Sequence, residues 1–271
     1  MTPQNDIQIS GTQLMYERPE ALHSSVHAEL RFQAREDLFA VAAKTHLIPL
    51  LVGEFAQAAL HYPIIFIGLE RTPVAVLGLK EGTNLFMADG KFDPTAYLPA
   101  YVRRYPFTLA ATEGDNAVVC IDAASKSFES GGEGKALFEN GEATQFTKDA
   151  IDFLNNFSAE SKRTGEFVRE LEKSGLFEVK TTTFVDGQSG KHEHVADYFS
   201  ISEEKLLALE PARLGELAKT GDLLAVYAHL MSLRKWDSVI AKQRAALENN
   251  TSNGNSDVTA DAGKRKGPST H

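Results

Sequence analysis

Three side chains in the first quarter of the sequence could together bind a metal ion: His27, His46 and Glu54. Two histidines and one carboxylate are the ligand set of many non-haem iron(II) oxygenases, which keep open positions for oxygen and substrate. The three side chains would have to converge in the folded chain, because metal–ligand distances are about 2 Å. One hypothesis is therefore a metal-dependent enzyme with a divalent metal such as iron as its cofactor.

Glu54 is the most unusual of these residues, because it lies inside the apolar stretch of residues 48–62. A buried carboxylate needs a partner, or its pKa rises. We expect an ion pair with Arg103 or Arg104, and we favour this over a general base or a metal ligand. His61 follows seven residues later and would share a face with Glu54 if the stretch were one continuous helix.

A second candidate site is the segment "NLFMADGKFDPTAYLPAYVRRYPF", residues 84–107. Tyr97, Tyr101 and Tyr105 recur every four residues, so on a helix they would share one face, and Arg103 and Arg104 lie beside them. Tyrosine and arginine are enriched in binding hot spots. Tyrosine also places its amphipathic ring at the edge of a hydrophobic core. Composition leaves both interpretations open, and the binding interpretation predicts a protein partner or a small anionic ligand.

Standard catalytic signatures are missing from the sequence. It contains no G-x-G-x-x-G after a strand pattern, no Walker A motif, no H-E-x-x-H and no G-x-S-x-G. Cys120 is the only cysteine, which excludes an intramolecular disulfide and a cysteine-based zinc site and favours a cytoplasmic location. It lies in "AVVCIDA", a buried-strand pattern, so we expect a small core residue rather than a reactive thiol.

Charge and hydropathy exclude two further classes of protein. The 271 residues carry a formal net charge of −9, whereas nucleic-acid and anionic-lipid binding depend on clustered cations. The longest apolar stretches are interrupted by Pro49, Gly53, Glu54 and Pro63, and none reaches the roughly 20 residues of a membrane helix. The first residues lack the basic start and apolar core of a signal peptide. We therefore expect a soluble protein that binds no nucleic acid.

The pattern of apolar residues predicts an α+β fold. Short runs rich in branched and aromatic residues predict strands at residues 27–32, 62–69, 73–80, 107–112, 117–123 and 176–187. Residues 63–68 and 74–80 form a predicted hairpin. Helical spacing marks residues 48–62, 94–105, 147–175 and 221–247. We expect an antiparallel or mixed sheet from the N-terminal half, packed by helices mainly from the C-terminal half.

Composition divides the chain into three zones. Residues 1–25 are polar and predict a weakly structured lead-in, and residues 26–247 have the composition of one folded domain. Residues 248–271 contain almost no large aliphatic side chains, so they cannot bury enough apolar surface to offset their ordering entropy. We expect them to form a disordered polar tail.

Six motifs in this order resemble the SapC family of bacterial proteins, named after an S-layer-associated gene. They are "YPIIF" (62–66), "VLGLKEGTNLF" (76–86), "YLPAYVRRYPF" (97–107), "VCIDAAS" (119–125), "ALFENGEAT" (136–144) and "LLAVYAHLMSL" (223–233). The resemblance spans residues 20–240. It implies that His27, His46, His229 and Glu54 belong to the family pattern, while Phe92 stands where the family usually has tryptophan.

The resemblance also implies a genomic setting. Similar proteins are encoded near TonB-dependent outer-membrane receptors, flavin-dependent halogenase-like proteins and cupin-like proteins, which suggests nutrient uptake or metabolite tailoring. Some relatives carry a peptide-transport permease label, which this sequence does not support because it has no apolar stretch of membrane-spanning length. A setting of this kind is an association rather than a mechanism.

Two functions from different classes follow. The first is a soluble accessory or binding protein without a cofactor, in which Tyr97, Tyr101, Arg103, Arg104 and Tyr105 hold a protein partner or a small anionic ligand. The second is the metal-dependent tailoring enzyme described above. We favour the first, because catalytic signatures are missing and hot-spot residues are clustered.

Overall fold

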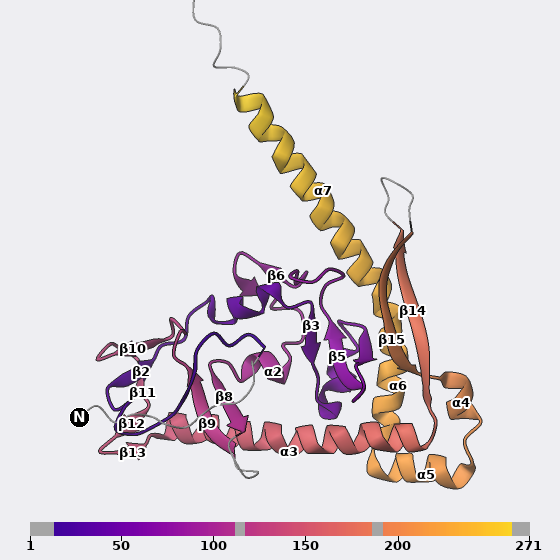
Figure 1. The fold of residues 1–271 in the computed structure, drawn as a ribbon, viewed down its shortest axis with the longest axis horizontal. Coiled ribbons are helices and arrows are strands. Elements are labelled where there is room, and N and C mark those ends of the chain that lie inside the picture. Colours follow the sequence, from indigo (N-terminus) through magenta and orange to yellow (C-terminus); the bar gives the residue numbers. More distant parts are fainter. Residues whose placement is uncertain (1–13, 112–116, 186–191, 262–271) are drawn as a thin grey trace, which may run out of the picture.

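The computed structural model describes residues 14–111, 117–185 and 192–261, without the side chains of residues 184–185, 192–196 and 249–261. Its sheets are antiparallel, and most of its helical residues follow residue 144 (Figure 1). The predicted α+β class is confirmed.

The largest sheet has five strands in the order β14-β15-β4-β5-β3, with antiparallel neighbours throughout. The predicted hairpin of residues 63–68 and 74–80 is confirmed as β4 and β5. The two longest strands come from the C-terminal half, so the sheet is not built from the N-terminal half alone. Its strands are β3 (Leu47–Pro49), β4 (Ile64–Ile67), β5 (Thr72–Val76), β14 (Phe177–Val185) and β15 (His192–Ile201).

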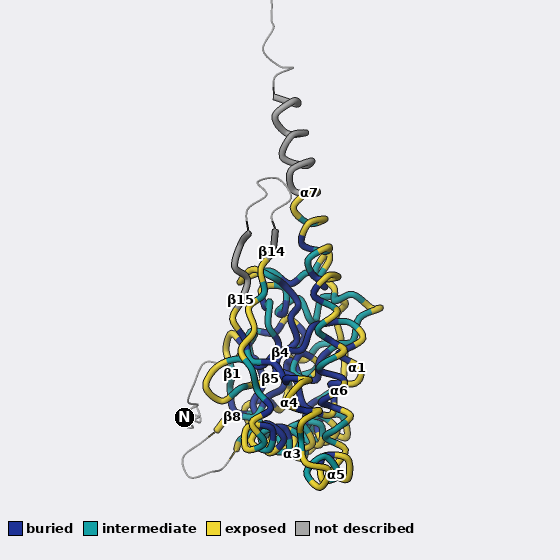
Figure 2. Tube along the Cα trace, turned by 90° about the vertical axis from the view of Figure 1, so that its right-hand side faces the viewer, coloured by how far each residue is buried: buried dark blue, intermediate teal, exposed yellow. Residues whose placement is uncertain are grey.

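Both faces of this sheet are covered, as the alternation along β4 shows. Ile64 and Phe66 pack into the main core, whereas Ile65 packs on the opposite face with Tyr198 and Trp236. Successive side chains of a strand point to opposite faces, so an uninterrupted apolar run predicts a strand buried on both sides. β4 and β5 accordingly are dark blue along most of their length in Figure 2.

Smaller sheets form the other end of the molecule. One is β1 (Pro19–Ala21), β9 (Ala117–Asp122) and β8 (Phe107–Ala111), and another is β10 (Phe128–Ser130), β2 (Leu30–Phe32) and β11 (Lys135–Ala136). Two short hairpins are β6 (Met87–Ala88) with β7 (Lys91–Phe92), and β12 (Phe138–Glu139) with β13 (Glu142–Ala143).

The folded part begins before the boundary expected at residue 26. Tyr16 is buried and its hydroxyl donates a hydrogen bond to the Phe107 carbonyl at 2.7 Å. The buried carboxylate of Asp122 accepts from the backbone N–H groups of Glu17 and Arg18. Composition could not reveal this, because a polar segment is ordered here by partners about 100 residues away in the chain.

A single long helix joins the two ends of the molecule. α3 (Gln145–Lys173) has 29 residues, which corresponds to about 44 Å of helix, and it runs beneath both groups of strands in Figure 1. Its first half packs Leu154 against Ile121, and its second half packs Phe167 and Leu171 into the main core. The helix is capped by Thr144, so it begins before the expected residue 147.

The remaining helices are shorter than α3. Two predictions need correction: residues 48–62 contain β3, a 3₁₀ turn and α1 rather than one helix, and residues 221–247 are divided between α6 and α7. α7 also continues past residue 248, where a disordered tail was expected to begin, while residues 262–271 of that tail lie outside the described residues. The helices are α1 (Phe55–Ala58), α2 (Ala100–Arg103), α4 (Glu203–Leu207), α5 (Pro211–Thr220), α6 (Asp222–Ser232) and α7 (Trp236–Asp261), with 3₁₀ helices at Leu38–Lys44, Val52–Glu54 and Leu233–Lys235.

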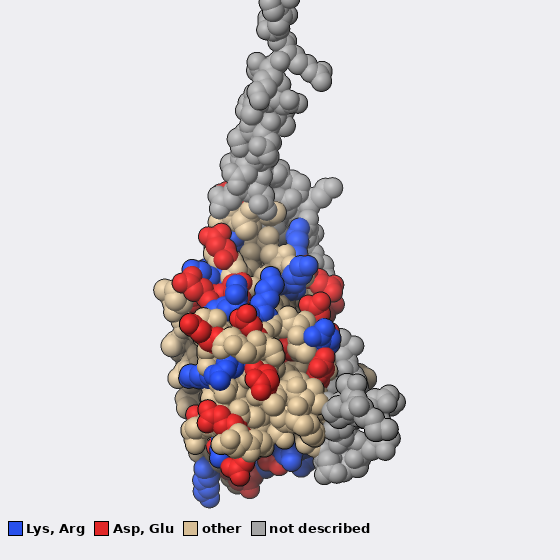
Figure 3. Space-filling view, turned by 90° about the vertical axis from the view of Figure 1, so that its left-hand side faces the viewer, with Lys and Arg blue, Asp and Glu red and all other residues tan. Residues whose placement is uncertain are grey.

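Two surface properties bear on function. None of the helices in the described part of the chain has the length and apolar character that crossing a membrane requires. On the face shown in Figure 3, lysine and arginine side chains are interspersed with aspartate and glutamate. That face therefore lacks the continuous cationic stripe typical of nucleic-acid binding.

Candidate functional site

Glu54 is a buried anchor of the fold. One carboxylate oxygen, Oε2, accepts a hydrogen bond from the backbone N–H of Leu51 at 2.9 Å. The other, Oε1, accepts from the N–H of Ala100 at 2.7 Å and from the Tyr97 hydroxyl at 2.8 Å. Ala100 is the first residue of α2, so the carboxylate satisfies one of the helix-start donors that have no partner within the helix. Glu54 thus fixes α2 against the segment that precedes α1.

Arg103, at the end of α2, is the expected cationic neighbour of Glu54, but the contact is long. Its Nη2 atom lies 4.0 Å from Glu54 Oε1 and donates to the Tyr97 hydroxyl at 3.2 Å. The guanidinium carbon lies 5.8 Å from the ring centre of Tyr97 and 5.7 Å from that of Phe153 in α3. The Arg103 side chain is 43% exposed. It is therefore held in place by aromatic rings while part of its surface stays open to solvent.

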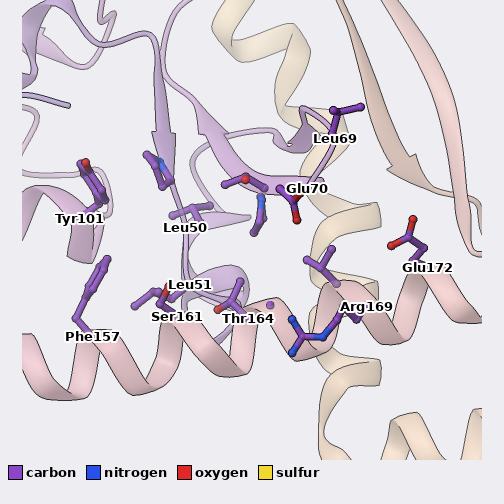
Figure 4. A pocket seen from close by; sticks show the side chains of 15 residues that line it. Leu50, Leu51, Leu69, Glu70, Tyr101, Phe157, Ser161, Thr164, Arg169 and Glu172 are labelled. Atoms are coloured by element: carbon purple, nitrogen blue, oxygen red, sulfur yellow. The ribbon is translucent and has the colours of Figure 1, made fainter. Parts of the chain in front are cut away.

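Arg104 lies among aromatic rings rather than beside Glu54. Its guanidinium carbon lies 3.9 Å from the ring centre of Tyr101, 4.9 Å from that of Phe157 and 5.5 Å from that of Tyr16. Phe157 rises from α3 toward Tyr101 of α2 (Figure 4). The expected ion pair of Glu54 is therefore with Arg103, at the limit of such a contact, while Arg104 makes cation–π contacts.

Tyr105, two residues beyond α2, is tied to the core. Its buried hydroxyl donates to Asp122 Oδ2 at 3.2 Å, and its ring lies 5.4 Å from that of Tyr16. Burial raises the pKa of Tyr105 to about 12. The same carboxylate holds the backbone of residues 17 and 18, so Tyr105 and Asp122 connect the candidate site to the start of the fold.

The two arginines and Tyr105 line one cleft of about 270 Å³, here named the Arg103 cleft. The structure thus brings together three of the five predicted binding residues in this cleft. Of the other two, Tyr97 accepts a hydrogen bond from Arg103, and Tyr101 lines another cavity. Aromatic rings from β2 and α3 complete the wall. The lining residues include Phe32, Arg103, Arg104, Tyr105, Phe146 and Phe153.

The groups of this cleft suit binding better than proton transfer. Burial, together with the Glu54 carboxylate, raises the pKa of Tyr97 to about 12, and efficient general acids and bases have a pKa near the working pH. An arginine remains protonated at all physiological pH values. Asp149 also lines the cleft, but the two arginines give it an excess of positive charge beside flat apolar surfaces, which is the chemistry of recognising an anion.

The structure does not bring His27, His46 and Glu54, the predicted metal ligands, together as a metal-binding group. Within the described ranges, no group of three or more His, Cys, Asp or Glu side chains is placed to hold a metal ion. Both Glu54 oxygens are occupied by hydrogen bonds within the chain. His27 Nδ1 accepts from the N–H of His23 at 3.0 Å and so organises its own loop. Burial lowers the pKa of both His27 and His46.

Two other histidines have structural surroundings. His61 cannot share a helix face with Glu54, because α1 ends at Ala58. His229 of α6 is fully buried, and its Nε2 atom accepts a hydrogen bond from the backbone N–H of Ile201 at 3.0 Å. His229 is therefore a hydrogen-bonded core residue. It fixes α6 to the end of β15.

Sequence reasoning missed three aromatic residues that contact the two arginines. Phe153 and Phe157 lie four residues apart on α3 and face α2, but the helical pattern of residues 147–175 gave neither of them a place in the site. Their spacing on a helix was a usable signal. Tyr16 had no such signal, because it lies in a polar segment that gains its structure from distant partners.

Comparison with known proteins identifies the family. The model of the SapC family matches residues 22–239. This range includes α2, its aromatic neighbours on α3, and both His27 and His46. No curated protein and no solved structure matches the chain. Because the match covers most of its 271 residues, the chain belongs to the SapC family.

Proposed function

We propose that this chain is a binding protein that holds a small anionic ligand with a flat apolar part in the Arg103 cleft. One observation carries the proposal: the Arg103 guanidinium is fixed by Tyr97 and Phe153, yet 43% of its side chain is exposed. A charged group that is already ordered loses little conformational entropy when a ligand binds.

The Arg103 guanidinium also has N–H donors that the described residues do not use. Arginine carries five N–H donors in a planar fork that matches a carboxylate or phosphate, and Arg103 uses one of them on the Tyr97 hydroxyl. Glu54 does not accept from Arg103, because its Oε1 atom lies 4.0 Å from Arg103 Nη2, beyond hydrogen-bond distance. An incoming carboxylate could therefore form charge-assisted hydrogen bonds with Arg103.

The walls of the cleft indicate what the uncharged part of the ligand should be. Phe32 and Phe146 are stacked, with ring centres 5.0 Å apart and 21° between their planes, and Phe153 lies beneath Arg103. Offset stacking and edge contacts favour an aromatic or similarly flat body. A cleft of about 270 Å³ has room for one small molecule. The family resemblance would connect such binding to nutrient uptake or metabolite tailoring, in an accessory role.

Replacing Arg103 with glutamine should weaken the binding of benzoate about tenfold or more, because a hydrogen bond to a charged group contributes about 1.5–3 kcal/mol. Benzoate joins a carboxylate to a flat ring, and benzamide has the same shape without the charge. Ligand-detected NMR titration of both compounds measures the difference. We expect the wild-type chain to prefer benzoate and the Arg103→Gln variant to show no preference.

Two variants make this test specific. Arg234→Gln removes another exposed arginine, in the 3₁₀ helix before α7, and should leave benzoate binding unchanged. Arg103→Lys keeps the charge but loses the planar fork, so binding should fall between wild type and Arg103→Gln. Equal affinity for benzoate and benzamide in the wild type, or full binding by Arg103→Gln at an unchanged melting temperature, would reject the proposal.

A further inference from the structure

A second cavity, of about 350 Å³, lies between α3 and the strands above it, and we name it the α3 cavity. Figure 4 shows it bounded by α3 below, by Leu50 and Leu51 in the middle, and by the β4–β5 turn with Leu69 and Glu70 above. Tyr101 and Phe157 close one end. Its volume lies in the range of about 300–1,000 Å³ typical of small-molecule sites.

The α3 side of this cavity is made of small residues. Ser161, Thr164 and Gly165 line it between the larger Phe157 and Arg169, which is the spacing of one helix face. The hydroxyl of Thr164 is already used, because it donates to the Glu160 carbonyl and accepts from the N–H of Val52. The helix therefore leaves space at its middle while remaining firmly attached to the segment above.

Arg169 and Glu70, which carry opposite charges, line the other end of the cavity together with Glu172. Arg169 comes from α3, and its guanidinium extends back along the helix toward Thr164, while Glu70 reaches down from the β4–β5 turn (Figure 4). A Cβ atom added to Gly165 would lie 3.4 Å from Arg169 Nη1, so this glycine gives the guanidinium its place.

Both charges are available to a ligand. Among the described residues, neither Arg169 nor Glu70 has a salt-bridge partner, and the nearby Glu172 is paired with Arg71 at 2.6 Å. A carboxylate and a guanidinium that share a cavity without pairing can each bind the opposite charge of one ligand. The uncharged remainder of the cavity is mainly apolar, through Leu50, Leu51 and Phe157.

We propose that the α3 cavity binds a zwitterion of the α-amino-acid type with an apolar side chain. The ligand carboxylate would pair with Arg169, its ammonium group with Glu70, and its side chain would lie against Leu50, Leu51 and the Tyr101–Phe157 end. This site is separate from the Arg103 cleft and does not depend on the function proposed there.

Saturation-transfer NMR with L-leucine, L-methionine and L-phenylalanine tests the proposal on the full chain. At least one of the three should bind, and 3-phenylpropionate and 2-phenylethylamine, which each lack one charge, should bind more weakly than L-phenylalanine by about fivefold or more. Arg169→Gln and Glu70→Gln should each weaken amino-acid binding by a similar factor. Both positions are exposed, so the melting temperatures should not change.

Matched variants separate this site from the first. Lys162→Gln removes an exposed cation of α3 that does not line the cavity, and Arg103→Gln alters the other cleft; neither should affect amino-acid binding. The proposal is overturned if none of the three amino acids binds at millimolar concentration, if the singly charged analogues bind equally well, or if Arg169→Gln and Glu70→Gln bind as wild type does. Loss of benzoate binding alone would refute only the proposal for the Arg103 cleft.

Discussion

Replacing Glu54 with alanine should lower the free energy of unfolding by about 3–5 kcal/mol, because two buried backbone donors and one partly buried hydroxyl would lose a charged acceptor. The carboxylate accepts from the N–H groups of Leu51 and Ala100 and from the Tyr97 hydroxyl, and Glu54 is only 6% exposed. Water cannot easily replace it there. Equilibrium unfolding in urea, with a common slope for both proteins, measures the difference.

Two milder variants show which bonds matter. Glu54→Gln keeps the shape but must turn an NH₂ group toward one of the backbone donors, so its cost should be smaller than that of alanine. Tyr97→Phe removes one donor and should cost about 1 kcal/mol. If Glu54→Ala instead lost less than about 1 kcal/mol, the carboxylate would not be a structural anchor.

The second large effect is expected at His229. Alanine there would remove a fully buried ring and leave the N–H of Ile201 without its acceptor, at a cost of about 3–4 kcal/mol at pH 7. Burial lowers the pKa of His229 to about 3, far below the value near 6.5 of an exposed histidine. The native state therefore holds this imidazole neutral, and its Nε2 lone pair is available to Ile201.

This burial also gives the protein a pH dependence with a definite sign. Between about pH 6.5 and pH 3 the unfolded chain binds a proton at this residue that the native state does not. Stability must fall as the pH drops through this window and be independent of His229 above it. From pH 7 to pH 5 the contribution lost is about 2 kcal/mol. Urea unfolding at both values should show wild type losing that much more than His229→Ala; equal losses would contradict the assignment.

The strands and the long helix were the predictable part of the fold. The apolar runs of β4 and β5 are buried on both faces, and α3 follows a helical stripe with Leu154, Phe167 and Leu171 inside. What the sequence could not show is where the ordered region begins. Tyr16 is held by the Phe107 carbonyl, and no local pattern in a polar segment indicates a partner so far away in the chain.

The sequence named candidate residues for a site, but it did not predict how they are arranged. A four-residue spacing of tyrosines suggested one helix face, yet α2 spans only Ala100–Arg103, so Tyr97 precedes it and Tyr105 follows it. The three rings therefore point into different surroundings. Glu54 was recognised as a carboxylate in need of partners, but those partners are mainly backbone N–H groups, and a sequence gives no sign of which backbone donors lack an acceptor.

Arg104 and the rings of Tyr101 and Phe157 form a wall that two cavities share. The guanidinium lines the Arg103 cleft, and the Tyr101 and Phe157 rings that it contacts line the α3 cavity. A ligand that moves this wall from one cavity changes the free energy of binding in the other cavity. Thermodynamic linkage then requires reciprocity: the factor by which the first ligand alters the affinity for the second equals the factor by which the second alters the affinity for the first.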